Sequence, residues 1–343
     1  MSVLLDDECG IFELLAAKGK IQFGLCCINN HLRNRGKISP TGEKVTDKSL
    51  WLPREIFNNR TCIRDTFSVD RAKQLALQNV KDLIPIIEWN EKHGIRHFRL
   101  SSDMFPHYTD PETEKYSMEF ADEDLKAAGA LANSLGHRLT MHPGQFCQIG
   151  TPKREVFEKT IEDLAMHAEI LDRMGMSDES ILCIHGGGVY GDKEGTMRRW
   201  ADQFDEMPKN VKRRIAIENC EKCYSAEDCL KIADSVKIPV IFDSHHYNCF
   251  CNYNPETVQL PADELMEEVV QSWRGRTPVM HVSDQRQTGP VGAHHDYVQA
   301  IPGYMLEIPY NFGCKLDIEI EAKAKEAAVL KLRHQYPYLF LKK

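Results

Sequence analysis

The feature that most constrains the fold is a repeated unit: a short apolar segment ends on a histidine or a carboxylate, and a helical segment follows. The unit is clear at Leu139-Thr-Met-His142, where Pro143-Gly144 breaks the strand and leaves the ring of His142 at a loop. A single histidine in this place is most often a hydrogen-bonding residue. The unit becomes informative because the chain repeats it.

Periodicity predicts where the repeated elements lie. Strands are expected at residues 21–27, 97–100, 138–141, 180–184, 214–218, 239–243, 279–281 and 316–321. Helices are expected at residues 70–93, from 121 onward, and at 154–174, 193–206, 226–236, 262–273 and 324–332. Residues 33–64 are polar and rich in turn formers, which predicts a long loop.

Eight strands alternating with helices predict an α/β protein with a single (β/α)8 TIM barrel, and a doubly wound open sheet is the structural alternative. The barrel is favoured because polar residues end successive strands, and only a closed barrel brings all those ends to one mouth. We expect the barrel domain to span residues 21–343, preceded by an arm or accessory helix over residues 1–20.

Composition narrows the class of protein and its compartment. The first residues lack a basic start and carry Asp6, Asp7 and Glu8, which is unlike a secretory signal, and no window is apolar enough to span a membrane. The twelve cysteines are therefore expected to be reduced thiols in the cytoplasm or nucleus. The net charge of −8 argues against a uniformly basic nucleic-acid-binding surface, but an anionic substrate can still meet bound metal ions.

The residues at the strand ends share one chemistry, because all are imidazoles or carboxylates: His142, His185, Glu218, Asp243, His246, His281, His294 and Glu321. Any one of them could be a helix cap or an ion-pair partner. Gathered at one barrel mouth, they require cations between them, because neighbouring buried carboxylates need positive charge. The pattern therefore predicts a metal cluster at the carboxyl-terminal face of the strands.

Nitrogen and oxygen ligands without thiolate suit zinc, manganese, iron(II) or cobalt, and Glu218 could bridge two ions. Clustered divalent ions activate water and stabilise phosphoryl oxygens, so metal-assisted phosphodiester hydrolysis fits best, with Glu218 as a catalytic residue. Sugar isomerisation by a two-metal barrel is the competing hypothesis.

The chain resembles the UV damage endonuclease family over residues 21–332. The motifs that carry the resemblance are Met141-His-Pro-Gly-Gln-Phe146, His185-Gly-Gly, Ile217-Glu-Asn219, Asp243-Ser-His-His246, His281, Gly292-Ala-His294 and Ile320-Glu-Ala-Lys323. This family is similar in fold to apurinic-site nucleases of the endonuclease IV type. The resemblance implies incision of duplex DNA immediately 5′ of ultraviolet photoproducts, leaving a 3′-hydroxyl, with abasic sites as a further substrate. An apurinic-site nuclease without photoproduct recognition is the nearest alternative.

The resemblance also implies three metal ions, with Mn²⁺ expected and Zn²⁺, Co²⁺ or Fe²⁺ as alternatives. The first ion would take His142, His185 and Glu218. The second would take Glu218, Asp243, His281 and Glu321, and the third would take His246 and His294.

Family positions near the lesion correspond to Asn29, Gln145 and Phe146, of which Gln145 and Phe146 would enter the duplex where the damaged pair leaves it. The chain departs from the family pattern at Leu25, where an aromatic residue is expected, at Asp110, where a histidine is expected, and at Val279, where a lysine is frequent. His107 is the nearby imidazole that could replace the missing histidine, as a further catalytic candidate.

Two further groups admit a functional and a structural interpretation. Cys220, Cys223, Cys249 and Cys251 could form a zinc site, but reduced loop cysteines are favoured. Six basic residues of the first loop could contact phosphates or form a solvated face: Arg33, Arg35, Lys37, Arg54, Arg60 and Arg64. The expected partner is damaged double-stranded DNA, bound by a monomer that uses no membrane and no nucleotide cofactor.

Overall fold

A computed structural model describes residues 17–340, so the arm predicted over residues 1–20 lies outside the described residues as far as residue 16. Eight parallel strands close into a barrel in sequence order, and β8 completes it by pairing with β1. The predicted TIM barrel is confirmed. The strands are β1 Ile21–Cys26, β2 His97–Leu100, β3 Arg138–Met141, β4 Leu182–His185, β5 Ile215–Glu218, β6 Val240–Asp243, β7 Val279–Val282 and β8 Leu316–Ile320.

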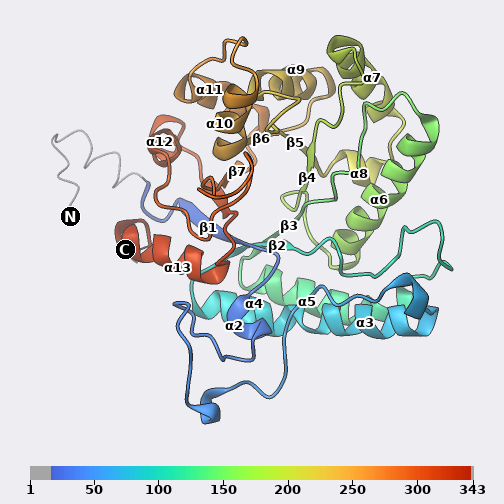
Figure 1. Ribbon diagram of the computed structural model, residues 1–343, viewed down its shortest axis with the longest axis vertical. Helices are drawn as coiled ribbons and strands as arrows, with labels where there is room; N and C mark the ends of the chain where they lie inside the picture. The colour runs from blue at the N-terminus through green and yellow to red at the C-terminus, as the bar shows by residue number, and fades with distance from the viewer. Residues whose placement is uncertain (1–16, 341–343) are drawn as a thin grey trace.

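Helices surround the strands, with α3, α4 and α5 together on one side of the barrel and α9 and α11 packed against each other elsewhere (Figure 1). The helices are α2 Asn30–Arg33, α3 Val69–Lys81, α4 Leu83–Lys92, α5 Asp122–Ser134, α6 Arg154–Arg173, α7 Lys193–Asp205, α8 Lys209–Lys212, α9 Ala226–Val236, α10 Ser244–Tyr253, α11 Ala262–Ser272, α12 Gly303–Asn311 and α13 Glu326–Gln335. Among the described residues, no helix is both long and apolar enough to cross a membrane.

The single helix predicted over residues 70–93 is two helices, α3 and α4, that meet at Asp82. Pro85 explains the break, because its ring clashes with the carbonyl four residues earlier, at Lys81. The side chain of Asp82 is buried and pairs with Arg54 at 2.5 Å and Arg60 at 2.7 Å. The helical periodicity was correct, but it does not report where a proline divides the helix.

Four described helices, the one-turn α2 and α8 and the longer α10 and α12, occupy segments for which the sequence predicted no helix. Helix α10 is rich in His, Asn and Cys, which are weak helix formers, and α12 contains Pro309. Helix α10 starts because the Asp243 carboxylate accepts a hydrogen bond from the backbone N–H of His246 at 2.7 Å. The predicted ligand His246 therefore stands on a helix rather than on a loop.

The interior of the barrel has two chemically different halves. The apolar half consists of Ile181, Cys183, Ala216, Ile241, Trp273 and Val279, which form a buried cluster of their own. The charged half consists of His97, Arg99, Arg138, Asp317 and Glu319, from strands β2, β3 and β8. Gly24 on β1 makes room for it, since a Cβ atom there would lie 2.6 Å from the ring of His97.

Candidate metal centre

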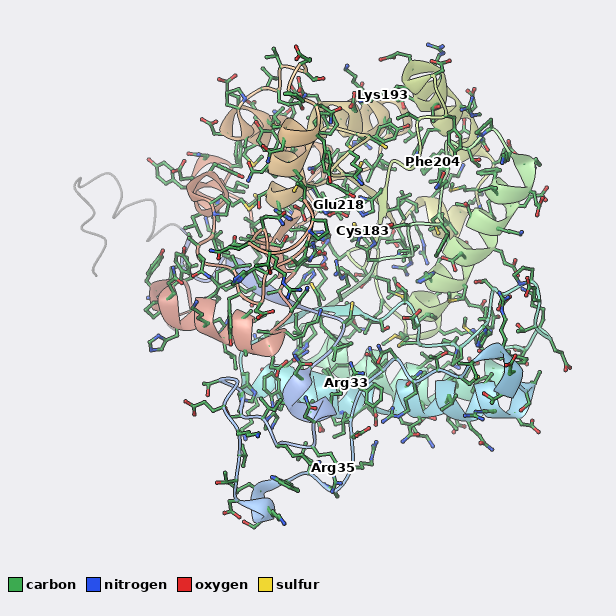
Figure 2. The ribbon with its side chains drawn as sticks, in the orientation of Figure 1. Arg33, Arg35, Cys183, Lys193, Phe204 and Glu218 are labelled. Carbon is green, nitrogen blue, oxygen red and sulfur yellow. The ribbon has the colours of Figure 1, made fainter. Side chains whose placement is uncertain are left out.

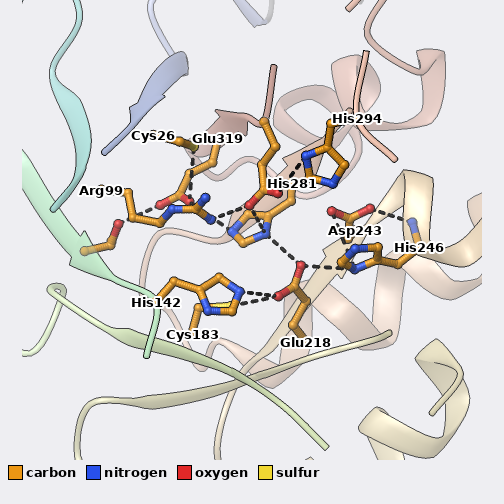
Figure 3. Close-up of polar contacts among 12 residues, drawn as sticks. Cys26, Arg99, His142, Cys183, Glu218, Asp243, His246, His281, His294 and Glu319 are labelled. Atoms are coloured by element: carbon orange, nitrogen blue, oxygen red, sulfur yellow. Dashed lines mark hydrogen bonds and ion pairs between the residues drawn. The ribbon is translucent and has the colours of Figure 1, made fainter. Parts of the chain in front are cut away.

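The strands deliver the predicted ligands to one mouth of the barrel, as Figure 3 shows for six of them. His185, Glu218 and Asp243 end their strands, and His281 lies inside β7. His142 and Glu321 directly follow β3 and β8. His246 comes from α10, and His294 lies beyond β7, where its backbone forms a bridge with Gln285. Parallel strands explain the convergence, because all their carboxyl ends face the same side.

Glu218 lies at the centre of the cluster and is fully buried. Its Oε2 atom lies 3.0 Å from Nε2 of His142 and 3.5 Å from Nε2 of His185. Its Oε1 atom lies 2.8 Å from Nδ1 of His281 and 3.4 Å from Nδ1 of His246. Each oxygen of one carboxylate therefore faces a separate pair of imidazoles, which is the arrangement required of a bridging ligand.

The remaining predicted ligands flank the Oε1 side of Glu218. Glu321 Oε1 lies 3.4 Å from Nδ1 of His281, and Glu321 Oε2 lies 3.6 Å from Nδ1 of His294. Oδ2 of Asp243 lies 3.8 Å from Nδ1 of His246. The rings of His246 and His294 are 6.4 Å apart between centroids, so His246 lies closer to Glu218 and Asp243 than to His294.

Burial and mutual charge shift the pKa values of these groups in opposite directions. Burial raises the pKa of the Glu218 carboxyl, but His281 and His185 outweigh it and hold the pKa well below its usual range. Burial lowers the pKa of His185 to about 4. Burial also lowers the pKa of His246, but Asp243 and Glu218 raise it to about 11. The pKa of Asp243 is raised by burial. Burial aside, the raised pKa values of His246 and Asp243 reflect the neighbouring carboxylates of the mouth, which favour positive charge there.

The residues present fit divalent metal ions. Three groups of residues each bring their potential ligand atoms within 4.8 Å of one another, and all three groups contain Glu218. Its companions are His142 and His185 in the first group, Asp243 and His246 in the second, and Cys183 and His281 in the third. Nδ1 of His185 and Oδ2 of Asp243 are buried and have no hydrogen-bond partner. Such orphaned atoms are costly unless a ligand satisfies them. Imidazole and carboxylate donors suit manganese, zinc, iron(II) or cobalt.

The mouth is a cavity of about 300 Å³ lined by Arg99, His142, Pro143, Gly144, Gln145, His185, Glu221, His246, Gly292, His294 and Glu321. Gln145 belongs to this lining, and the next residue, Phe146, has a side chain that is 90% exposed. The ring of Phe146 lines the neighbouring cavity, which also contains His107. The structure thus brings Gln145 to the mouth of the metal centre and the adjoining Phe146 to the next cavity.

Asn29 and His107 are not brought to this mouth. Asn29 is fully buried and caps α2, because its side-chain oxygen accepts a hydrogen bond from the Leu32 N–H at 3.0 Å. His107 lines a separate cavity, and its ring contacts the Cys62 carbonyl at 2.7 Å and Asp110 at 3.1 Å. Both of its ring nitrogens are therefore engaged away from the cluster.

The positions of family departure also find structural explanations. Leu25 is fully buried in the large hydrophobic core. Val279 belongs to the apolar half of the barrel interior. Asp110 forms a bidentate contact with Arg64 at 2.9 and 3.1 Å. In this chain, each of these three residues is therefore part of the core, of the barrel interior or of an ion pair.

The cysteines of residues 17–340 all carry free thiols. The metal-capable groups found among these residues include neither Cys220 nor Cys223, Cys249 or Cys251. Sγ of Cys220 instead accepts hydrogen bonds from the backbone N–H groups of Cys223 and Tyr224, each at 3.2 Å. The favoured interpretation, reduced loop cysteines, agrees with this geometry.

The basic first loop projects from the barrel, and Figure 2 shows Arg35 well away from Glu218. Its charges are largely used within the loop and its base: Arg54 and Arg60 pair with Asp82, and Arg64 pairs with Asp110. Arg33 and Lys37 lie over the rings of Phe57 and Trp51, at 5.1 and 5.0 Å. These contacts fix the loop against itself.

Sequence reasoning missed two charged residues next to the cluster, Arg99 and Glu319 (Figure 3). Arg99 contacts Glu319 and Glu321, and Glu319 contacts His281. A signal was present along β8 and the residue after it, where Asp317, Glu319 and Glu321 alternate with apolar residues. Alternation places all three on one face of a strand, which in a buried barrel must be the interior.

The closed barrel and its cluster of imidazoles and carboxylates define a TIM-barrel protein with a candidate multi-metal centre. The profile of the UV-endonuclease UvdE family matches residues 21–339. The chain therefore belongs to the UV-damage endonuclease family, whose members are DNA repair endonucleases.

Relatives support this assignment. A relative from Acanthamoeba polyphaga mimivirus is 37% identical over 325 residues, which cover 92% of this chain and 91% of the relative. The UV-damage endonuclease of Schizosaccharomyces pombe is 33% identical over 329 residues, covering 90% of this chain but 52% of that protein. The crystal structure of SacUVDE superposes with a TM-score of 0.76 at 25% identity, covering 93% of this chain and all of that one.

The fold alone is shared more widely. Endonuclease IV from Thermus thermophilus superposes with a TM-score of 0.51 at 15% identity, over 75% of this chain and 94% of that one. This likeness confirms the expected relation in fold to nucleases of the endonuclease IV type.

Proposed function

We propose that the protein is a metal-dependent endonuclease that hydrolyses the phosphodiester immediately 5′ of ultraviolet photoproducts in duplex DNA and leaves a 3′-hydroxyl, with abasic sites as a second substrate. The observation that carries the proposal is Glu218, whose two oxygens face two separate histidine pairs at a mouth lined by Gln145. We further propose that it acts as a monomer in an intracellular compartment where its thiols stay reduced.

The predicted ligands would hold three divalent ions, with Mn²⁺ as the proposed metal. His142, His185 and Glu218 would hold the first, and Glu218, Asp243, His281 and Glu321 the second. His246 and His294 would hold the third. When bound, such ions lower the pKa of water and stabilise charge on phosphoryl oxygens.

The chain's own groups would position the DNA. Phe146, 90% exposed, offers an aromatic face to replace the stacking lost where a damaged pair leaves the duplex. Gln145, in the lining of the mouth, offers an amide that can satisfy base edges. Their place on one short loop beside His142 keeps lesion recognition within reach of the reacting phosphate.

The test is to incubate the purified protein with Mn²⁺ and an end-labelled duplex that carries a single photoproduct. We expect one nick on the 5′ side, and extension of the product by a DNA polymerase would show the 3′-hydroxyl. An undamaged duplex is the negative control. A duplex with an abasic site separates the proposed enzyme from an apurinic-site nuclease, which would nick that substrate alone.

The variant Glu218→Gln keeps the shape of the side chain but removes the shared charge. Since loss of an outer partner of a metal ligand costs about 10- to 100-fold, loss of a bridging ligand should lower incision by roughly 100-fold or more. Metal content measured by elemental analysis should fall as well. Normal incision by a folded, metal-depleted protein would remove the metal mechanism.

A further inference from the structure

A fourth metal-capable group does not share Glu218 and consists of Cys26, Glu319 and Glu321, all buried. The guanidinium of Arg99 lies beside this group. Nη1 of Arg99 lies 3.2 Å from Oε2 of Glu319 and contacts Oε1 of Glu321 more closely still (Figure 3). Because a guanidinium supplies the charge these carboxylates need, this group does not require an ion.

Glu319 is 1% exposed and collects contacts from four directions. Its Oε1 accepts a hydrogen bond from the Thr140 hydroxyl at 2.6 Å and contacts Nε2 of His97 at 2.8 Å. Its Oε2 contacts Arg99 and lies 3.1 Å from Nε2 of His281. The last contact is close enough for an ion pair, although its angle is outside the range of a well-aligned hydrogen bond.

His281 is therefore held between two carboxylates, with Nε2 toward Glu319 and Nδ1 toward Glu218 at 2.8 Å. Glu321 is divided less sharply: its Oε1 contacts Arg99 and also lies 3.4 Å from Nδ1 of His281, and its Oε2 faces His294 at 3.6 Å. Both ligands are therefore contacted from the charged half of the barrel and also face the cluster.

We propose that Glu319 and Arg99 are positioning residues of the metal centre: Glu319 leaves Nδ1 of His281 as the donor atom, and Arg99 orients the carboxylate of Glu321. This inference rests on the metal centre proposed above. A carboxylate on the far nitrogen of a ligating histidine fixes the orientation of the ring and raises its basicity. Arg99 orients Glu321 in a comparable way, because its planar guanidinium group holds one carboxylate oxygen in place.

Glu319 is in turn held by charged residues nearer the opposite end of the barrel. Nδ1 of His97 lies 3.1 Å from Oδ2 of Asp317, which also accepts a hydrogen bond from Arg138 at 3.0 Å. Arg138 donates further hydrogen bonds to the backbone carbonyls of Glu179 at 2.6 Å and Thr277 at 2.8 Å. Glu319 is thus held from below by a chain of contacts that ends on backbone, which limits its freedom to move away from His281.

Asp317 supplies a matched control, because it is a carboxylate on the same strand and the same face, and its ion pairs are with His97 and Arg138 rather than with His281 or Glu321. The test compares Glu319→Gln with Asp317→Asn in the full chain. Mn²⁺ binding is measured by isothermal titration, and folding by thermal unfolding without metal. An amide cannot accept from all the donors around Glu319, so at least one contact is lost.

We expect Glu319→Gln to weaken Mn²⁺ binding about 10- to 100-fold, and Asp317→Asn, which reaches Glu319 only through His97, to weaken it several-fold less while also lowering stability. A milder variant, Thr140→Val, removes one hydrogen bond to Glu319 and should give a smaller loss of affinity; it carries the test if Glu319→Gln does not fold. Wild-type affinity in the Glu319→Gln and Thr140→Val proteins would overturn the inference. Equal losses in Glu319→Gln and Asp317→Asn would also overturn it, because the effect would then be general.

The same titration keeps the two proposals apart. If the wild-type protein binds no divalent ion and does not nick irradiated DNA, the proposed function fails. If the wild type binds Mn²⁺ and nicks, but the Glu319 and Thr140 variants bind equally well, only the positioning role fails.

Discussion

The two halves of the barrel interior support the same ring of ligands in different ways. On β4, β5, β6 and β7, the residue two positions before each ligand is apolar: Cys183, Ala216, Ile241 and Val279. On β3 and β8, the residue in the same place is polar, Thr140 before His142 and Glu319 before Glu321. Residues two apart share a face of a strand, so these positions form the layer directly beneath the cluster.

The difference teaches that a ligand can be held either by packing or by directed contacts. In the apolar layer, Ala216, Ile241 and Val279 have no side-chain donor or acceptor and leave the ligand atoms above them free of competing partners. Cys183 is the exception, because its thiol donates a hydrogen bond to Oε2 of Glu218 at 3.1 Å. The charged layer contacts the ligands directly: Glu319 contacts His281, and Arg99 contacts Glu321. A change of Ala216, Ile241 or Val279 should therefore alter stability alone, whereas a change in the charged half should also alter the metal centre.

The largest effect on stability is expected from Arg99→Met, which leaves Glu319 and Glu321 buried without their shared cation. Breaking a buried ion pair by removing one partner costs about 3–5 kcal/mol. Urea unfolding of the metal-free protein measures this loss. Arg99→Lys, which keeps the charge but not the planar group, should lose less. A loss below about 1 kcal/mol for Arg99→Met would show that the charged half does not depend on its arginine.

The second effect is a dependence of stability on pH that only the charged half should show. Burial lowers the pKa of His97, but Asp317 and Glu319 outweigh it and raise the pKa above 6.5. The stabilisation by His97 is therefore fully present below pH 6.5 and is lost as the pH rises through the folded-state value, because the unfolded chain releases its proton first.

The variant His97→Gln tests this dependence. Loss of its buried contacts should cost about 1–3 kcal/mol at about pH 6, and the difference from wild type should shrink as the pH rises above about 6.5. The measurement is urea unfolding of both metal-free proteins at several pH values. A constant difference between them would contradict the assignment of the charge to His97.

A smaller effect is expected in the apolar half from Ile241→Val, which removes one buried methylene beneath Asp243. Such a deletion costs about 0.5–1.5 kcal/mol. The loss should be the same at every pH, and Mn²⁺ affinity should equal that of the wild type by isothermal titration. Weakened Mn²⁺ binding in this variant would erase the distinction between the two halves.

The smallest change in stability, within about 0.5 kcal/mol, is expected from the double variant Gln145→Ala with Phe146→Ala, because both side chains are exposed. Metal binding should be unchanged, but the preference for irradiated over undamaged duplex should fall several-fold in a competition nicking assay. Tyr310→Ala removes an aromatic ring that is 49% exposed on α12, outside the lining of both the mouth and the neighbouring cavity that Phe146 lines, and serves as the control. Equal preference in the double variant and the wild type would make Phe146 a rim residue without a role in recognition.

The barrel could be predicted from the sequence because its signals are local. Short apolar segments, breaks such as Pro143-Gly144 and the cap at Ser68 each act within a few residues, and they fix strand ends and helix starts. Helices α10 and α12 escaped prediction because a cap and tertiary packing, rather than intrinsic propensity, hold their weak helix formers in place. The identity of the strand-end residues also followed from the sequence, since a parallel barrel must gather them at one mouth.

Only the tertiary structure decided which atom of each of those residues faces which partner. That one oxygen of Glu218 faces His142 and His185 while the other faces His246 and His281 depends on strands distant in the chain. The pairing of Arg99 with Glu321 joins residues 222 positions apart, and no sequence spacing encodes it. The physical reason is that strand periodicity is a property of the backbone and can be seen in a short stretch of sequence. A buried charged atom instead needs a partner to offset its loss of water, and that partner comes from another part of the chain.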